Sequence, residues 1–203
     1  MTRTTAAAER RADILAATLR VIAREGLAET TTRKIAAEAG VNQATLRYYF
    51  GSKDDLLFAV LQEMMRTTGE VVQAGISASN ELSEAIAESI RAFWLHVEEA
   101  PELQVMQYEL TLYALRHPES AWLAKQQYDG YSALVETLLE QNFAAAGKPC
   151  AISFAELARF IIAGLDGLIL QFISGGRDTI QAQRDLDHLI HAVIALAEGE
   201  PSA

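Results

Sequence analysis

Residues 42–57, NQATLRYYFGSKDDLL, form a short block that is rich in polar and basic side chains. Seven of these 16 residues are Arg, Lys, Tyr, Asn, Gln or Thr. Asn42 is a good helix N-cap, and the helix that it starts is predicted to run through about Phe50. Leu46 and Phe50 are spaced so that they share one helix face, and we expect both to point into a core.

The opposite face of this helix is predicted to be exposed. It offers an amide, a methyl group, a hydroxyl, a guanidinium and a phenol, from Gln43, Ala44, Thr45, Arg47 and Tyr48. Such groups read base edges and phosphates in the major groove of DNA. Lys53 begins the next helix, where its charge adds to free N–H groups that attract phosphate. A solvated helix surface is the alternative, but the combination of groups favours a DNA-reading face.

The preceding residues, ETTTRKIAAEAG, predict a second short helix. Thr31 is a candidate N-cap, and Gly40 is a candidate stop because glycine adopts the left-handed conformation at little cost. Two short helices joined by a glycine-containing turn form a helix-turn-helix. We expect its core to include Ile22, Ile35 and Val41.

The rest of the chain also shows helical spacing of apolar residues. Further helices are predicted over about residues 6–25, 53–75, 81–99, 102–117, 119–146, 152–174 and 178–198. No alternating strand pattern occurs, so the predicted fold class is all-α. The apolar stretch RFIIAGLDGLILQFI carries Asp166 in its middle, which favours a buried helix over a membrane span.

The charge of the chain is unevenly distributed. The net charge of the 203 residues is -10, which disfavours a protein that coats nucleic acid with its whole surface. Residues 1–55 nevertheless carry nine Lys or Arg against seven Asp or Glu, and the remainder is strongly acidic. Such asymmetry predicts an interaction end and a different body. The first residues contain no apolar signal region, so we expect a cytoplasmic protein.

The stretch TTTRKIAAEAGVNQATLRYYFGSKDDLL resembles the DNA-binding signature of the TetR-family transcriptional regulators, and the match extends from about Ile14 to Leu57. The resemblance implies an all-helical homodimer. Residues 1–52 would form a three-helix DNA-binding domain, and residues 53–203 would form a larger helical domain that binds a small molecule and dimerises. The stretch RFIIAGLDGLILQFI is similar to the penultimate helix of such regulators, which helps to build their dimer interface.

The resemblance also implies roles for single residues. Arg47 occupies a base-reading position at which family members most often have Tyr, so an operator sequence cannot be carried over from a relative. Tyr48 and Lys53 match positions that contact phosphate. Thr31 would donate to phosphate from the start of its helix, with support from Arg33. The predicted DNA-binding residues are Thr31, Arg33, Asn42, Gln43, Ala44, Thr45, Arg47, Tyr48 and Lys53.

The acidic body is rich in large aromatic residues. Most are expected to be core, but buried Trp and Tyr need partners for their polar atoms, so some should line a cavity. The candidate effector contacts are Trp94, Tyr108, Tyr128, Gln171 and Phe172. Because these walls offer few charges, the expected effector is small and largely apolar.

Two C-terminal segments predict the dimer interface. Ala163, Gly164 and Gly167 would let helices approach closely, beside the apolar residues Ile161, Leu165 and Leu168. The last helix offers Leu186, Leu189, Ile190, Val193 and Ile194. We expect an isologous four-helix interface and therefore a palindromic operator. The alternative is that these faces only close the core of one chain.

No motif predicts catalysis or a cofactor. The sequence lacks a nucleophile elbow, a phosphate loop and an HExxH motif. His188 and His191 could hold a metal with Asp185 or Asp187, but a solvated helix edge is the simpler interpretation, and Cys150 is expected to be a structural thiol. A ligand-responsive repressor is therefore the leading hypothesis. The alternatives are a DNA-binding protein without a small-molecule effector and an enzyme on a helical scaffold.

Overall fold

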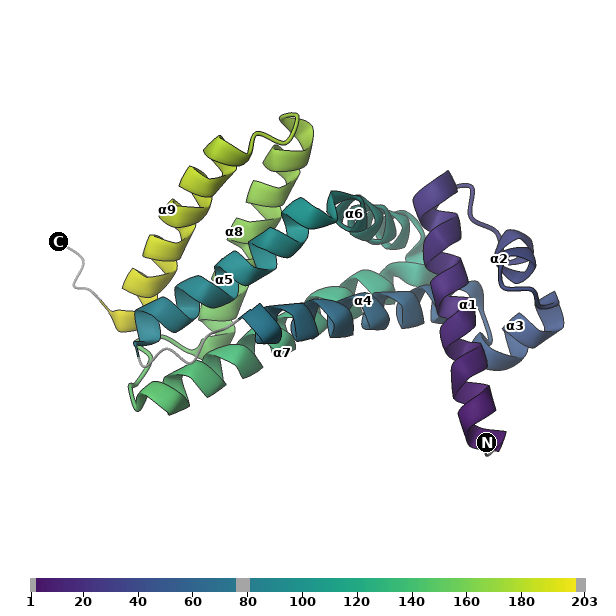
Figure 1. Cartoon of the computed structure of the whole chain (residues 1–203), viewed down its shortest axis with the longest axis horizontal. Coiled ribbons are helices and arrows are strands. Elements are labelled where there is room, and N and C mark those ends of the chain that lie inside the picture. Colours follow the sequence, from purple (N-terminus) through teal and green to yellow (C-terminus); the bar gives the residue numbers. More distant parts are fainter. Residues whose placement is uncertain (1–2, 76–80, 200–203) are drawn as a thin grey trace. The chain divides into compact units, whose positions relative to one another are not determined.

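The computed structural model describes residues 3–75 and 81–199, and all regular structure within these ranges is helical (Figure 1). The all-α prediction is thus confirmed. The elements are α1 (Arg3–Glu25), α2 (Thr32–Glu38), α3 (Gln43–Phe50), α4 (Lys53–Gly75), α5 (Leu82–Glu99), α6 (Pro101–Arg116), the 3₁₀ turn η1 (Pro118–Ser120), α7 (Ala121–Ala146), α8 (Phe154–Ser174) and α9 (Thr179–Glu198).

The short helices α2 and α3 begin at the predicted caps. The Thr31 hydroxyl accepts a hydrogen bond from the Lys34 amide at 3.3 Å. The Asn42 side chain accepts one from the Thr45 amide at 2.8 Å. Gly40 has φ +64°, in the left-handed region, and turns the chain between the two helices. Each cap satisfies an amide that would otherwise lack a partner at a helix start.

The start of α4 is also fixed by its own first turn. The Ser52 hydroxyl accepts from the Asp55 amide at 3.0 Å, and the Asp55 carboxylate accepts from the Ser52 amide at 3.1 Å. This reciprocal arrangement is a capping box. It orients the first residues of α4, which include Lys53.

The described chain forms two compact units. Unit 1 contains residues 1–65 and 102–127, and unit 2 contains residues 66–101 and 128–203. Most of α6, η1 and the start of α7 therefore cluster with the N-terminal helices. Grouping by contact differs in this way from the division along the sequence after residue 52.

In unit 1, the helix-turn-helix has its own core. Leu46 and Phe50 are buried together with Ile35, and Val41 packs against them, as predicted. Figure 1 shows α2 and α3 on one side of α1. The prediction was wrong for Ile22, which belongs to a separate cluster.

This second cluster of unit 1 joins α1 and α4 to α6. Ile22, Leu27 and Leu57 are buried against Met106 and Leu110. Helix α1 thus contributes apolar residues to two separate clusters. The side that carries Ile22 contacts α6 instead of α3. A polar contact accompanies this packing, because the Leu27 amide donates to the carboxylate of Glu109 at 2.8 Å.

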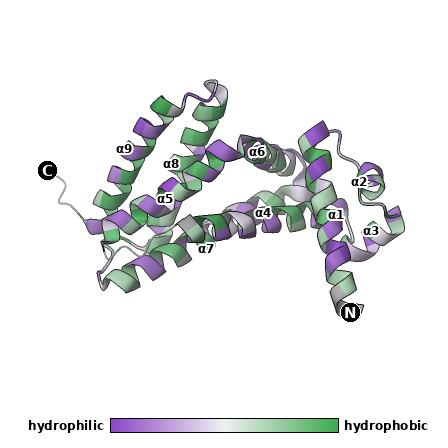
Figure 2. Cartoon of the chain, viewed as in Figure 1, coloured by the Kyte–Doolittle hydropathy of each residue, from purple (hydrophilic) through white to green (hydrophobic). Residues whose placement is uncertain are grey.

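In unit 2, α9 packs against both α8 and α5. Helix α8 has the length and hydropathy of a membrane span, properties that core helices share, and Figure 2 shows hydrophobic residues over most of it. One face is buried at helical spacing, with Leu157, Ile161, Leu165, Ile169 and Phe172. Asp166 lies on the same helix and accepts a hydrogen bond from Tyr128 on α7.

At Gly164, α8 lies close to a side chain of α9. A Cβ atom at this position would lie 2.5 Å from Cδ1 of Leu189. At Gly167, three residues further along α8, a Cβ atom would meet nothing within 4 Å. The two glycines therefore lie in different environments, one inside the helix pair and one outside it.

Candidate functional site

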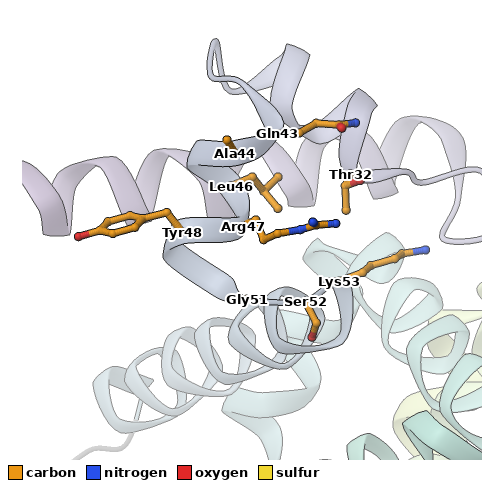
Figure 3. A pocket seen from close by; sticks show the side chains of 9 residues that line it. All are labelled: Thr32, Gln43, Ala44, Leu46, Arg47, Tyr48, Gly51, Ser52 and Lys53. Atoms are coloured by element: carbon orange, nitrogen blue, oxygen red, sulfur yellow. The ribbon is translucent and has the colours of Figure 1, made fainter.

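A hollow of about 550 Å³ opens where α3 meets α2 and the start of α4 (Figure 3). Its lining residues are Thr32, Gln43, Ala44, Leu46, Arg47, Tyr48, Gly51, Ser52 and Lys53. In Figure 3 the side chains of Gln43, Arg47 and Lys53 point to one side of α3, whereas Tyr48 points to the other. The hollow is thus bounded by polar and cationic groups from three helices.

The exposed face of α3 carries the predicted reading residues. Gln43, Ala44 and Arg47 are exposed, and Tyr48 is the most exposed large hydrophobic residue in the described part of the chain, at 84%. Leu46 anchors the helix from below, at 3% exposure. One face of α3 thus packs into the core, and the other presents polar side chains and the small Ala44 to solvent.

Several cations of unit 1 are neutralised by its own carboxylates. Arg20 and Arg24 of α1 both pair with Glu38 of α2, at 2.9 and 3.1 Å. Lys34 pairs with Glu25 at 2.6 Å. These ion pairs lower the pKa of Glu25, chiefly through Lys34, and that of Glu38, chiefly through Arg20. The network ties α1 to α2, and its two carboxylates offset two of the three positive charges.

Other cations near the hollow keep their charge available. Within the described residues, neither Arg33 nor Arg47 has a carboxylate within ion-pair distance. Arg11 stacks over the ring of Phe50, with its guanidinium carbon 5.1 Å from the centroid. The uncompensated charges of Arg33 and Arg47 therefore make this end of an acidic protein attractive to an anion.

Lys53 has an aromatic partner. Its ammonium lies 5.3 Å from the centroid of the Tyr113 ring, contributed by α6. Partial burial lowers the pKa of Lys53, and the negative charge of the neighbouring Asp54 opposes that effect. Lys53 is thus a supported cation at the edge of the hollow.

The remaining predicted DNA-binding residues have structural duties as well. Asn42 and Thr31 use their side-chain oxygens as helix caps, and the Thr45 hydroxyl donates to Asn42 at 3.1 Å. Arg33 is exposed on α2. Thr32 lines the hollow, although the sequence argument selected Thr31 instead. Thr32 could have been found in the sequence, because it is the first residue of α2 and follows the predicted cap.

Among the candidate effector contacts, the structure brings Trp94 and Phe172 together. Their rings meet edge to face with centroids 5.5 Å apart, and Trp94 is completely buried. The indole N–H of Trp94 donates to Glu98 at 2.9 Å, so its polar atom is satisfied within the chain. Gln171 is adjacent in sequence but exposed, and its amide donates to the backbone of Gly167.

Tyr128 and Tyr108 are half-buried, in unit 2 and unit 1 respectively. The Tyr128 hydroxyl donates to Asp166 at 2.9 Å. Burial, and then the charge of Asp166, raises the pKa of Tyr128 to about 12. Tyr128 is therefore a neutral hydrogen-bonding group at neutral pH.

Two buried glutamines were missed by the sequence argument. Oε1 of Gln104 on α6 and Nε2 of Gln127 on α7 have no hydrogen-bond partner within the part of the chain that the structure describes. The other amide atom of Gln127 accepts from the Thr111 hydroxyl at 2.9 Å. Unpaired buried polar atoms are costly and are therefore candidates for contact with a bound molecule or water. Helical spacing alone gave no sign of them.

The predicted interface residues fall into two groups. Leu186, Ile190 and Val193 are buried within unit 2. These residues therefore fill the core of their own chain, which was the alternative to an interface role. Ile161, Gly164 and Leu165 likewise face inward. The outward stripe of α8 instead consists of Phe160, Ala163, Gly167 and Leu170. Phe160 and Leu170 are large hydrophobic residues at 39% and 48% exposure.

The possible metal site is not assembled. His188 and His191 are exposed, and among the described residues no group of three His, Cys, Asp or Glu side chains could hold a metal ion.

Two family models match the sequence of this chain. The model of bacterial regulatory proteins of the tetR family matches residues 14–60. A second model, described as a tetracyclin repressor-like C-terminal domain, matches residues 80–196. The two matches cover the helix-turn-helix and most of the remaining helices.

Individual relatives agree with these matches. The nicotine-responsive transcriptional repressor HdnoR of Paenarthrobacter nicotinovorans is 27% identical over 188 residues, which span 92% of this chain and 94% of that protein. The multidrug binding protein EbrR, solved in complex with imidazole, is 28% identical with a TM-score of 0.67, over 96% of this chain and 93% of that one. FadR of Bacillus subtilis, solved with stearoyl-CoA, shares the fold at 22% identity, with a TM-score of 0.65 over 93% of this chain and 98% of that one.

Proposed function

Because the chain belongs to the TetR family of bacterial regulatory proteins and is a ligand-responsive transcriptional repressor, we propose that it binds a palindromic operator as a homodimer and leaves it when a small, largely apolar effector binds. The family consists of regulators that are not enzymes, which removes the helical-scaffold enzyme from the alternatives. Such a regulator acts on the bacterial chromosome, in the cytoplasm.

The DNA-binding part of the proposal rests on the exposed face of α3. A short helix presents Gln43, Arg47 and Tyr48 to solvent, and no carboxylate of the described residues neutralises Arg47. A guanidinium at the tip of a helix-turn-helix suits two acceptors of guanine in the major groove. Arg47 is therefore assigned to base reading.

The other predicted residues are assigned to the backbone of the DNA or to close approach. Tyr48 on the reading helix, and Lys53, Thr31 and Arg33 beside it in the chain, would contact phosphates, which set affinity and orientation. The side chains of Gln43, Ala44, Thr45 and Asn42 lie along the first turns of α3, where a base edge or a thymine methyl group would pass. Thr32 joins this set because it lines the same hollow.

Dimerisation is assigned to the outward stripe of α8. Phe160 and Leu170 are exposed large hydrophobic residues, and Ala163 and Gly167 between them are small enough to admit a second helix. Space around Gly167 within the chain leaves room for that approach. On α9, Leu196 is also exposed, at 38%. Two copies of this face would form an isologous contact, which matches a two-fold symmetric operator.

The effector part of the proposal keeps Trp94, Tyr108, Tyr128, Gln171 and Phe172 as candidate contacts. The aromatic pair of Trp94 and Phe172 supports an apolar ligand, and Tyr128 offers a neutral hydroxyl. Within unit 1, Gln104 and Gln127 are separate candidates for contact with a bound molecule, because each has a buried amide atom without a partner among the described residues. The nicotine response of HdnoR and the imidazole bound to EbrR support a small, mostly apolar molecule with one or two polar atoms.

Helix α4 is the proposed connection between effector and DNA. It begins at Lys53 and continues without interruption to Gly75, and the boundary between the two compact units follows Met65. A ligand shifts an equilibrium only through its different affinities for the two states. A coupling free energy of about 1–3 kcal/mol would change operator affinity roughly 5- to 150-fold.

The experiment is a calorimetric titration of effector into the protein with and without operator duplex, with nicotine and imidazole as the first probes. Operator DNA should weaken effector binding by the same factor by which effector weakens operator binding, since allosteric coupling is reciprocal. Equal dissociation constants in the two titrations would favour the alternative, a DNA-binding protein without a small-molecule effector.

A further inference from the structure

The first turn of α4 is held by residues that lie more than fifty positions later in the chain. The carboxylate of Asp54 accepts two hydrogen bonds, from the Tyr113 hydroxyl at 3.1 Å and from the Ser120 hydroxyl at 2.5 Å. Ser120 is almost completely buried, at 1% exposure. Hydrogen bonds to a carboxylate are shorter and stronger than those between neutral groups. The end of α6 and the turn η1 therefore fix Asp54.

The same tyrosine supports the neighbouring lysine. The Lys53 ammonium lies 5.3 Å from the centroid of the Tyr113 ring. A free lysine side chain loses conformational entropy when it is held in one place. The Tyr113 ring already restricts the lysine side chain in the free protein. Less conformational entropy is therefore lost when the ammonium binds a phosphate.

Tyr113 is itself immobilised by its surroundings. It packs against the buried cluster of Met106 and Leu110 and against that of Ala114 and Leu123. The His117 ring also lies against it, tilted by 34° with a centroid separation of 4.4 Å. The tyrosine is thus held by contacts with several residues of α6 and α7, with His117 and with Asp54 of α4.

We propose that Tyr113 is a positioning residue for DNA binding, which holds Lys53 and the start of α4 so that the ammonium meets an operator phosphate. Tyr113 lies outside residues 14–60, which carry the match to the DNA-binding model, and within residues 80–196, which carry the match to the C-terminal model. A residue of the second region thereby tunes a DNA contact of the first. The inference rests on the proposed function, because it requires Lys53 to contact phosphate.

The test measures operator affinity over a range of salt concentrations for four variants. Lys53→Ala should weaken binding to all sequences and lower the slope of log K against log [salt] by about one per head.

Tyr113→Leu removes both ring and hydroxyl and should weaken binding roughly 5- to 30-fold for two heads, as expected from a cation–π contact in each. Tyr113→Phe keeps the ring and should retain most of the affinity and the wild-type slope. Leu112→Ala, at an exposed neighbour on α6, is the matched control and should bind like the wild type.

A double-mutant cycle separates positioning from general damage. In a Lys53→Ala background, Tyr113→Leu should cause no further loss of affinity, because the group that it positions is absent. The same fold loss in both backgrounds would mean that Tyr113 only stabilises the fold, and would overturn the inference. Wild-type affinity and salt slope for Tyr113→Leu would overturn it as well. An unchanged salt slope for Lys53→Ala would instead refute the phosphate contact, and with it that part of the proposed function.

Discussion

At the scale of single residues, the proposed reading head contains both neutralised and available cations. Arg47 is exposed and has no carboxylate partner among the described residues, so its guanidinium is free for a base pair. Arg20 is also exposed but is paired with Glu38 at 2.9 Å. Of these two arginines, only Arg47 is therefore expected to contact DNA.

We expect Arg47→Ala to relax the preference at one base pair of each half-site. The loss of discrimination should be about 1–3 kcal/mol, the value of a good bidentate contact. The measurement is competition between operators that differ at single base pairs. Arg20→Ala is the matched control and should leave the preference unchanged. An identical preference profile for Arg47→Ala and the wild type would show that another residue reads the bases.

At the scale of elements, the ion pairs between α1 and α2 make the stability of unit 1 depend on pH. The pKa of Glu38 is lowered, chiefly by Arg20 and then by Arg24. The folded state therefore binds fewer protons than the unfolded state in mildly acidic solution. The stabilisation is present above the unfolded pKa of 4.5 and is lost as pH falls through the lower folded value.

We predict that Glu38→Gln lowers the thermal stability at neutral pH and flattens its decline below about pH 4.5. Circular dichroism melting curves from neutral pH down to about pH 3 measure both effects. Glu29→Gln, at an exposed glutamate of the same region, is the control. Parallel pH profiles for Glu38→Gln and the wild type would mean that the network contributes nothing to folding.

The helix pair α8 and α9 gives a second prediction at this scale. Gly164→Val places a branched side chain where a Cβ atom already lies 2.5 Å from Leu189, so it should destabilise the protein by about 1–3 kcal/mol through overpacking. Gly167→Ala adds a methyl group that meets nothing within its own chain, so it should destabilise the protein much less than Gly164→Val, even with the second copy of the proposed dimer against this stripe. Chemical denaturation measures both. A loss for Gly167→Ala as large as that for Gly164→Val would contradict the assignment of the two glycines to different faces.

Sequence reasoning located the elements well because their ends are chemically marked. Asn42 and Thr31 cap the two short helices as expected, and the spacing of Leu46 and Phe50 gave the buried face of α3. Periodicity says which residues point the same way but not what they meet. For that reason Ile22 was assigned to the wrong cluster.

The contacts between distant segments were beyond the sequence for the same reason. The hydrogen bond from Tyr113 to Asp54 joins residues 59 positions apart, and the local sequence around either residue does not predict this contact. Leu186 and Ile190 have the spacing of an interface helix, yet both are buried inside their own unit. The outward stripe of α8 could be recognised only after the inward one was known.

At the scale of the whole molecule, the account requires a dimer. We expect light scattering to give twice the mass of one chain at micromolar concentration. Phe160→Glu should shift the protein toward a monomer, because a charge in an apolar contact is costly when unpaired. Arg159→Glu, which puts the same side chain at the neighbouring exposed position, is the control. A wild-type protein that is monomeric would remove both the interface and the expected symmetry of the operator.

The central claim is that a two-fold symmetric protein reads DNA through α3, and selection of bound duplexes from a random pool tests it most directly. The account predicts enrichment of an inverted repeat whose half-sites lose one specified base pair when the selection is repeated with Arg47→Ala. Sequencing that returns no enriched motif, or a motif without inverted symmetry that Arg47→Ala leaves unchanged, would contradict it.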